Sequence, residues 1–232
     1  QALSEIAWGA AAAWTRASEA LQARPGPAVF AHEHLVEIEL AGMRLLSFGK
    51  AKPDDPPVVV VAPFALHDAG LADFAPGHSL VEAFHAVGLG RLRIAECRSA
   101  EAATQNYGID AYLAELNVLV DGIGGRARLV GLCQGGWLAL AYAARFPGKV
   151  ERLALAGAPV DLGACESAMT FAVRNAPPGG FESLIAAGAG RVFGAQLLQF
   201  WAQGVDLPTL AREALQSDEP DLIARFAEWY AR

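Results

Sequence analysis

The chain has 232 residues, a formal net charge of −7 and 53% hydrophobic residues. This apolar content excludes an intrinsically disordered chain, and the lack of any Lys/Arg run argues against nucleic-acid binding. The longest apolar runs are far shorter than the roughly 18 residues of a membrane span. The three cysteines lack metal-ligand spacing. We therefore expect a cytoplasmic protein that uses no metal or cofactor.

Strand-like and helix-like segments alternate along most of the chain. Strands are expected at 35–40, 43–48, 58–62, 91–96, 127–132 and 150–156. Helices are expected at 3–22, 79–87, 109–120 and 137–146. The first two strands form a hairpin, and residues 64–77 are expected to be a polar loop. The alternation predicts an α/β fold with a doubly wound, mostly parallel sheet flanked by helices.

The pattern changes after Pro159, because no convincing strand follows it. We expect three parts: an N-terminal helical segment (1–27), an α/β core (28–163) and a helical cap (164–232). A helical stretch placed after a sheet strand suggests a lid over an active site.

The most informative motif is Gly131-Leu-Cys133-Gln-Gly-Gly136, which follows a strand and opens a helix. With serine in place of cysteine this is the nucleophile elbow, a tight strand-to-helix turn that presents a nucleophile. Glycines flank the nucleophile because a Cβ atom would clash in so tight a turn. The N-terminus of the following helix favours negative charge on the sulfur. The other interpretation is a buried cysteine in a glycine-rich turn.

An oxyanion created by such a nucleophile needs two hydrogen-bond donors. The backbone N–H of Gln134 is the first candidate, since it follows the nucleophile. The second is expected from the loop after the third strand, where the N–H of Phe64 or Ala65 is placed to donate.

A general base is harder to assign, because all five histidines precede Cys133. Enzymes with this turn carry the acid and then the histidine after the nucleophile. His67 is a candidate base and Asp161 a candidate acid, whereas His32 and His34 are expected at the surface. Otherwise the acid and histidine come from a missing C-terminal segment or a second chain, or the site is degenerate.

At the motif G-L-C-Q-G-G the chain resembles the polyhydroxyalkanoate synthases and the intracellular polyhydroxybutyrate depolymerase-like proteins. The family box is G-x-C-x-G-G, and the V-V-V-V-A-P strand and the A-G-A-P-V-D segment are also similar. The resemblance covers roughly residues 35–232. It implies an α/β-hydrolase fold whose last two strands are missing from this chain.

The resemblance also implies a function. Cys133 attacks the carbonyl of a polyester or a small hydroxyacyl ester, and an acyl-cysteine forms. We favour a depolymerase-like hydrolase of 3-hydroxybutyrate esters, located in the cytoplasm and associated with polymer granules. The first alternative is a synthase-like acyltransferase that uses 3-hydroxyacyl-CoA. The second is a non-catalytic binding module of the same fold.

Overall fold

The computed structural model describes residues 29–49, 57–63, 68–164, 170, 174, 178–188, 190–192 and 206–230. The chain divides into two compact units. One is Ala28–Glu166, and the other combines Gln1–Pro27 with Ser167–Arg232. The helix expected at 3–22 lies outside the described residues.

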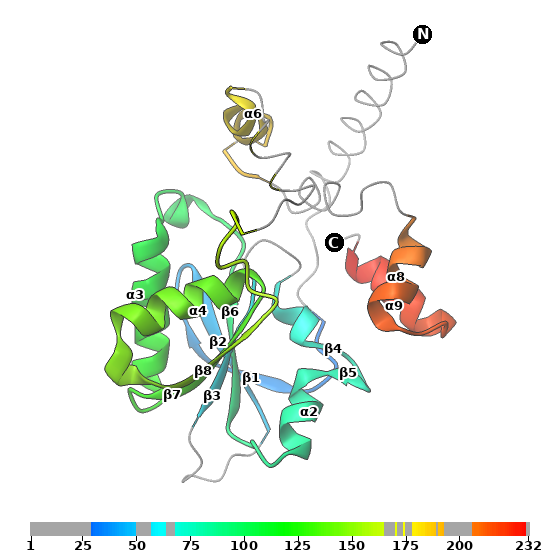
Figure 1. Cartoon of the computed structure of the whole chain (residues 1–232), viewed down its shortest axis with the longest axis horizontal. Helices are drawn as coiled ribbons and strands as arrows, with labels where there is room; N and C mark the ends of the chain where they lie inside the picture. The colour runs from blue at the N-terminus through cyan, green and yellow to red at the C-terminus, as the bar shows by residue number, and fades with distance from the viewer. Residues whose placement is uncertain are drawn as a thin grey trace. The chain divides into compact units, whose positions relative to one another are not determined.

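The Ala28–Glu166 unit is built on a six-stranded sheet with the order β1-β2-β6-β3-β7-β8 (Figure 1). Its strands are β1 (His34–Glu39), β2 (Met43–Phe48), β3 (Val58–Val61), β6 (Leu92–Cys97), β7 (Ala127–Leu132) and β8 (Val150–Ala156). The pairs β1–β2 and β2–β6 are antiparallel. The pairs β6–β3, β3–β7 and β7–β8 are parallel. The predicted α/β fold with a mostly parallel sheet is therefore confirmed.

Helices cover both faces of this sheet. They are α2 (Leu80–Ala86), α3 (Ile109–Gly122) and α4 (Gln134–Arg145), with short turns η2 (Ala102–Thr104) and η3 (Pro147–Lys149). Residues of α3 and α4 share one apolar cluster with Val59 and Val61. Val58 and Val60 belong to the other cluster, which includes Val81 of α2. Because successive strand residues point to opposite faces, β3 is buried on both, as predicted.

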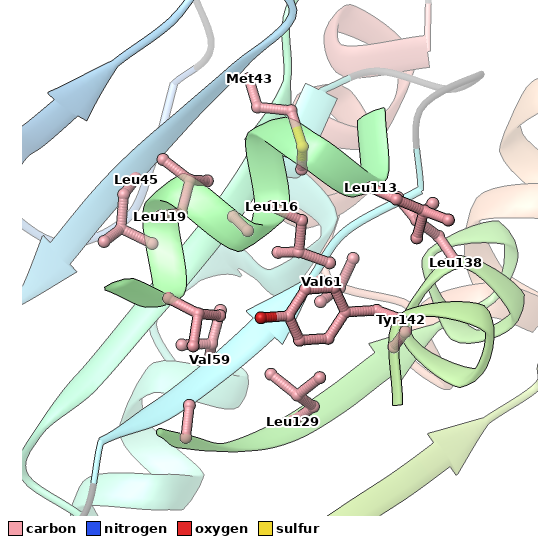
Figure 2. Packing of buried hydrophobic residues seen from close by; sticks show 14 of the residues in the cluster. Met43, Leu45, Val59, Val61, Leu113, Leu116, Leu119, Leu129, Leu138 and Tyr142 are labelled. Carbon is pink, nitrogen blue, oxygen red and sulfur yellow. The ribbon is translucent and has the colours of Figure 1, made fainter. Parts of the chain in front are cut away.

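Tyr142 of α4 marks the centre of the first cluster (Figure 2). Its ring is fully buried and lies near Leu116, Val61 and Leu129. The hydroxyl donates a 3.2 Å hydrogen bond to Asn117 Oδ1, as a buried phenol requires. This packing fixes α4 against β7, and so fixes the turn that joins them.

The segment expected to be a polar loop, 64–77, holds more structure than its sequence indicates. Its described part contains η1 (Asp68–Ala72), β4 (Asp73–Ala75) and the pairing of β4 with β5 (His78–Ser79). A short two-stranded sheet therefore replaces the second half of the expected loop. Hydrophobic periodicity could not predict it, since these strands have only three and two residues.

A fully buried carboxylate, Asp73, explains why these short strands form. It accepts hydrogen bonds from the backbone N–H of His32 at 2.8 Å and from Ser79 Oγ at 2.6 Å. The Nδ1 atom of His32 lies 2.7 Å from the same carboxylate, and its Nε2 atom lies 3.2 Å from Glu82. The His32 side chain is 36% exposed, in keeping with the expected surface position. Its contacts with Asp73, which the sequence did not indicate, join the segment before β1 to the β4–β5 pair.

In the second unit the described elements are helices: α6 (Gly180–Ala187), α8 (Leu207–Leu215) and α9 (Pro220–Tyr230). The helices α8 and α9 contact each other, with Ala211 and Phe226 buried. The side chain of Asp206 caps α8 by accepting from the Thr209 N–H at 3.0 Å. Among the helices that the structure describes, none is long and apolar enough to cross a bilayer.

Candidate active site

Cys133 occupies the turn between β7 and α4 in an unusual backbone conformation. Its φ is 48° and its ψ is −120°. A positive φ costs a non-glycine residue of the order of 1–3 kcal/mol, and such residues concentrate at functional sites. The turn is held by two hydrogen bonds: Cys133 N–H donates to the Ala156 carbonyl at 2.8 Å, and Gly136 N–H donates to the Cys133 carbonyl at 2.9 Å. The cysteine is thereby fixed to the end of β8 as well as to α4.

Three glycines make this turn sterically feasible. A Cβ atom at Gly131 would lie 2.4 Å from Gly136 Cα, and one at Gly136 would lie 2.4 Å from Ala158 Cβ. A Cβ atom at Gly135 would lie 2.1 Å from the carbonyl oxygen of Val61. These separations are far below van der Waals contact, so only glycine fits at the three positions. The end of β3 and the first turn of α4 can therefore approach closely beside Cys133.

Gln134 is the first residue of α4. The first N–H groups of a helix have no acceptor inside the helix, and they carry its positive dipole end. This is the location that the sequence predicted for the first oxyanion donor. The proposed second donors, Phe64 and Ala65, and the candidate base His67 lie outside the described residues.

Asp161, the candidate acid, lies five residues beyond the end of β8 and is exposed. Its Oδ1 atom accepts a hydrogen bond from Gly163 N–H at 2.8 Å. In this contact the carboxylate caps the loop that follows β8, as aspartate side chains often do in turns. A catalytic role for Asp161 stays a prediction.

His34 and Cys97 have packing contacts, not catalytic ones, in the structure. The His34 ring lies 5.4 Å from the Phe48 ring, centroid to centroid, so it packs against an aromatic side chain instead of standing free at the surface. Burial raises the pKa of the Cys97 thiol to about 12, which makes it an inert packing thiol. Cys165 lies outside the described residues. In the parts of the chain that are described, no three His, Cys, Asp or Glu residues are grouped as a metal site would need.

Glu96, at the carboxyl end of β6, is a buried charge that the sequence analysis missed. Its side chain is only 2% exposed. It forms an ion pair with Arg44 of β2 and accepts the backbone N–H of Ala69 at 3.1 Å. The available signal was a lone acidic residue inside the otherwise apolar end of a strand, I-A-E-C, because a buried charge needs a partner.

The last strand, β8, has an open outer side. Among the described residues no strand pairs with that side of β8. Ala154, Leu155 and Ala156 are exposed, Leu155 by 40%. Apolar residues on both faces are typical of an interior strand of a parallel sheet, whereas β8 lies at its edge.

Comparison with known proteins identifies one family. The family described as alpha/beta hydrolase fold matches residues 88–230, more than half of the chain. No curated protein matches. Among solved structures, a probable hydrolytic enzyme from Pseudomonas aeruginosa PAO1 has a TM-score of 0.50 at 15% identity. That match covers 88% of this chain and 61% of the other, so this chain spans less than two thirds of it.

Two further solved structures are similar. A membrane phospholipase A, described as a bacterial virulence factor, has 18% identity and a TM-score of 0.49, covering 91% of this chain and 77% of the other. The thioesterase domain from the curacin biosynthetic pathway has 20% identity and a TM-score of 0.47, covering 86% and 67%.

Proposed function

Because the chain belongs to the alpha/beta hydrolase fold family, we propose that it is a hydrolase whose nucleophile is Cys133. The backbone of Cys133 carries the proposal, with its φ of 48° in the turn between β7 and α4. In a turn of this kind the nucleophile projects from the carboxyl edge of the sheet. A packing thiol requires no such conformation, as Cys97 illustrates inside a regular strand.

The reaction proceeds through an acyl-cysteine. The Cys133 Sγ atom bonds to the substrate's carbonyl carbon, the thiol proton passes to the general base, and the π electrons move onto oxygen. The Gln134 N–H donates to this oxyanion, and a Phe64 or Ala65 N–H completes the site. The C–O bond then breaks and the leaving oxygen takes the proton from the base. Water cleaves the thioester, which releases the acid and restores the thiol.

The substrate class follows from the motif. Gly131, Cys133, Gly135 and Gly136 match the box of the polyhydroxyalkanoate enzymes, so we propose that the substrate is an ester of 3-hydroxybutyrate, as oligomer or polymer. A cytoplasmic location at polymer granules belongs to the same proposal. The residue after the cysteine, Gln134, favours the depolymerase-like relatives.

The general base and its acid are proposed to come from a polypeptide segment outside these residues. Two observations support this. The chain spans 61% of the Pseudomonas structure. In addition, β8 exposes Leu155 and two alanines at an edge where no described strand pairs with it, and a further strand there would bury them. Such a segment would reach the carboxyl edge of the sheet beside Cys133.

The proposal is tested by hydrolysis of 3-hydroxybutyrate oligomers, measured with the chain and the proposed base-supplying segment both present, for the wild type and three variants. Cys133→Ala should abolish the release of free hydroxy acid, and Cys133→Ser should lower it strongly. Cys97→Ala is the matched control, because it removes a thiol from the same domain, and it should keep the activity. Activity that survives in Cys133→Ala contradicts the proposal.

The same assay separates the alternatives. Turnover of 3-hydroxybutyryl-CoA into polymer, without release of hydroxy acid, would establish the acyltransferase. Binding of polymer by both the wild type and Cys133→Ala, with no turnover by either, would establish the binding module.

A further inference from the structure

Exposed large apolar side chains are concentrated at one place in the Ala28–Glu166 unit, at the carboxyl end of β8 and just beyond it. Nine such side chains are exposed among the described residues of this unit, and three of them lie between positions 155 and 162. They are Leu155, Val160 and Leu162, exposed by 40%, 55% and 63%. Isolated exposed apolar side chains are ordinary, whereas a group of them marks a site of contact with a ligand or another molecule.

The loop that carries Val160 is built onto the nucleophile turn. It leaves β8 at Ala156, whose carbonyl accepts the Cys133 N–H at 2.8 Å. Two residues later, Ala158 lies so close to the first turn of α4 that a Cβ atom at Gly136 would be 2.4 Å from the Ala158 Cβ. The Val160 N–H donates to the Ala158 carbonyl at 2.9 Å, which closes a tight turn. Val160 is therefore held beside the helix turn that begins next to Cys133.

Leu162 follows in a second closed turn. The Oδ1 atom of Asp161 accepts the Gly163 N–H at 2.8 Å, and the Ala164 N–H donates to the Asp161 carbonyl at 3.3 Å. The charged side chain of this loop is thus bonded to the loop itself, while the apolar side chains on either side of it are exposed. Neither Val160 nor Leu162 is part of the two apolar clusters of the unit. Within the described residues, the loop presents apolar surface that the core of the unit does not use.

We propose that Val160 and Leu162 contact the acyl part of the substrate and thereby set the preference for acyl-chain length. This inference rests on the proposed function, because an acyl group on Cys133 Sγ extends from the turn onto which the loop is built. The methyl and methylene groups of a hydroxyacyl ester match this surface, since ligand sites are lined mostly by apolar side chains. Each methylene group removed from water favours substrate binding by roughly 4-fold.

The test compares two esters that differ only in acyl-chain length, p-nitrophenyl acetate and p-nitrophenyl hexanoate. With either ester, Cys133 Sγ bonds to the acyl carbon, the C–O bond to p-nitrophenolate breaks, and the thiol proton goes to solvent. The measured quantity is the ratio of the two acylation rates, each corrected for the p-nitrophenolate that Cys133→Ala releases. Alkylation by iodoacetamide, in which Sγ displaces iodide, reports the reactivity of the thiol when no acyl group is present.

The variants are Val160→Ser, Leu162→Ser and the double variant, because serine removes most of the apolar surface. The double variant should lower the hexanoate-to-acetate ratio by about 5-fold or more, and leave the acetate and alkylation rates unchanged. Each single variant should lower the ratio less. The matched control is Val118→Ser, since Val118 is also a large apolar residue, 48% exposed on α3. It should keep the wild-type ratio.

The outcomes separate the inference from the proposed function. If neither ester acylates wild-type Cys133, the proposed function is wrong and the inference falls with it. If the wild type is acylated and the double variant keeps its ratio, only the inference is wrong. The same holds if the hexanoate and acetate rates fall in proportion, because the two residues then support the turn and not the acyl group.

The single variants decide the matter if the double variant does not fold by circular dichroism. A lower hexanoate-to-acetate ratio in either of them, with unchanged alkylation, supports the inference. A wild-type ratio in both overturns it.

Discussion

The two edges of the central sheet are built differently. At the β1 edge, charged residues alternate with apolar ones, and the pairing is irregular between Val36 and Ile38. Glu37 and Glu39 of this strand form ion pairs with Arg93 and Arg98. Charges and irregular pairing are the features by which natural edge strands avoid pairing with other chains.

The β8 edge has these features only at its start, where Glu151 pairs with Arg128 at 2.9 Å. The remainder, L-A-L-A, is apolar and largely exposed. This composition suits a strand with neighbours on both sides. The comparison teaches that β1 carries the charges and irregular pairing typical of an edge strand, whereas most of β8, beside the Cys133 turn, lacks them.

The largest predicted effect compares Gly135, in the first turn of α4 beside Cys133, with Gly42, in the turn between β1 and β2. Gly135→Ala should lower the free energy of unfolding by about 3 kcal/mol or more, because its Cβ would overlap backbone that cannot move aside. Gly42→Ala should cost only about 1 kcal/mol, because its Cβ would meet side chains at 3.1–3.2 Å. Urea denaturation measures both. Equal losses would show that the Cys133 turn is no tighter than the β1–β2 hairpin.

A smaller effect is expected from a charge placed on each edge. Leu155→Lys should lower the self-association of this chain, measured by sedimentation velocity over a range of concentrations, because it places a charge on an apolar edge that no described strand covers. Leu35→Lys is the control, since Leu35 is 74% exposed on β1, and it should change nothing. Identical sedimentation of the two variants would mean that the two edges do not differ in their tendency to self-associate.

The smallest effect concerns pH and the segment that leads into β1. The hydrogen bond with Asp73, together with the nearby Glu82 carboxylate, raises the pKa of His32. The stabilisation is therefore complete below about pH 6.5, the ordinary imidazole pKa. It is lost as the pH rises through the raised pKa of the folded protein. Because His32 is 36% exposed, we expect less than about 1 kcal/mol.

The contribution of His32 is measured as the difference in unfolding free energy between the wild type and His32→Gln, once below about pH 6.5 and once well above it. The difference between them should shrink as the pH rises. His34→Gln is the control, since His34 contacts aromatic rings. A His32→Gln effect that is constant with pH would contradict the electrostatic origin.

Local patterns account for what the sequence could predict. The apolar run at β3 and the spacing of the glycines around Cys133 are local patterns in the sequence, so the strand and the turn could be predicted. The contacts that require those glycines, with Val61 and Ala158, are long-range and could not. The β4–β5 pairing depends on His32 and Asp73, which are 41 residues apart. The Glu96–Ala69 contact is likewise long-range. Neither leaves a periodic signal, and both became visible only in three dimensions.

The most direct test of Cys133 as nucleophile is to trap its acyl intermediate. The 232-residue chain would be treated with p-nitrophenyl butyrate, quenched in acid, digested and sequenced by tandem mass spectrometry. We predict a butyryl thioester on the peptide that carries Cys133, absent from Cys133→Ala and present in Cys97→Ala. No butyryl group on Cys133, or equal labelling of Cys133 and the buried Cys97, would contradict it.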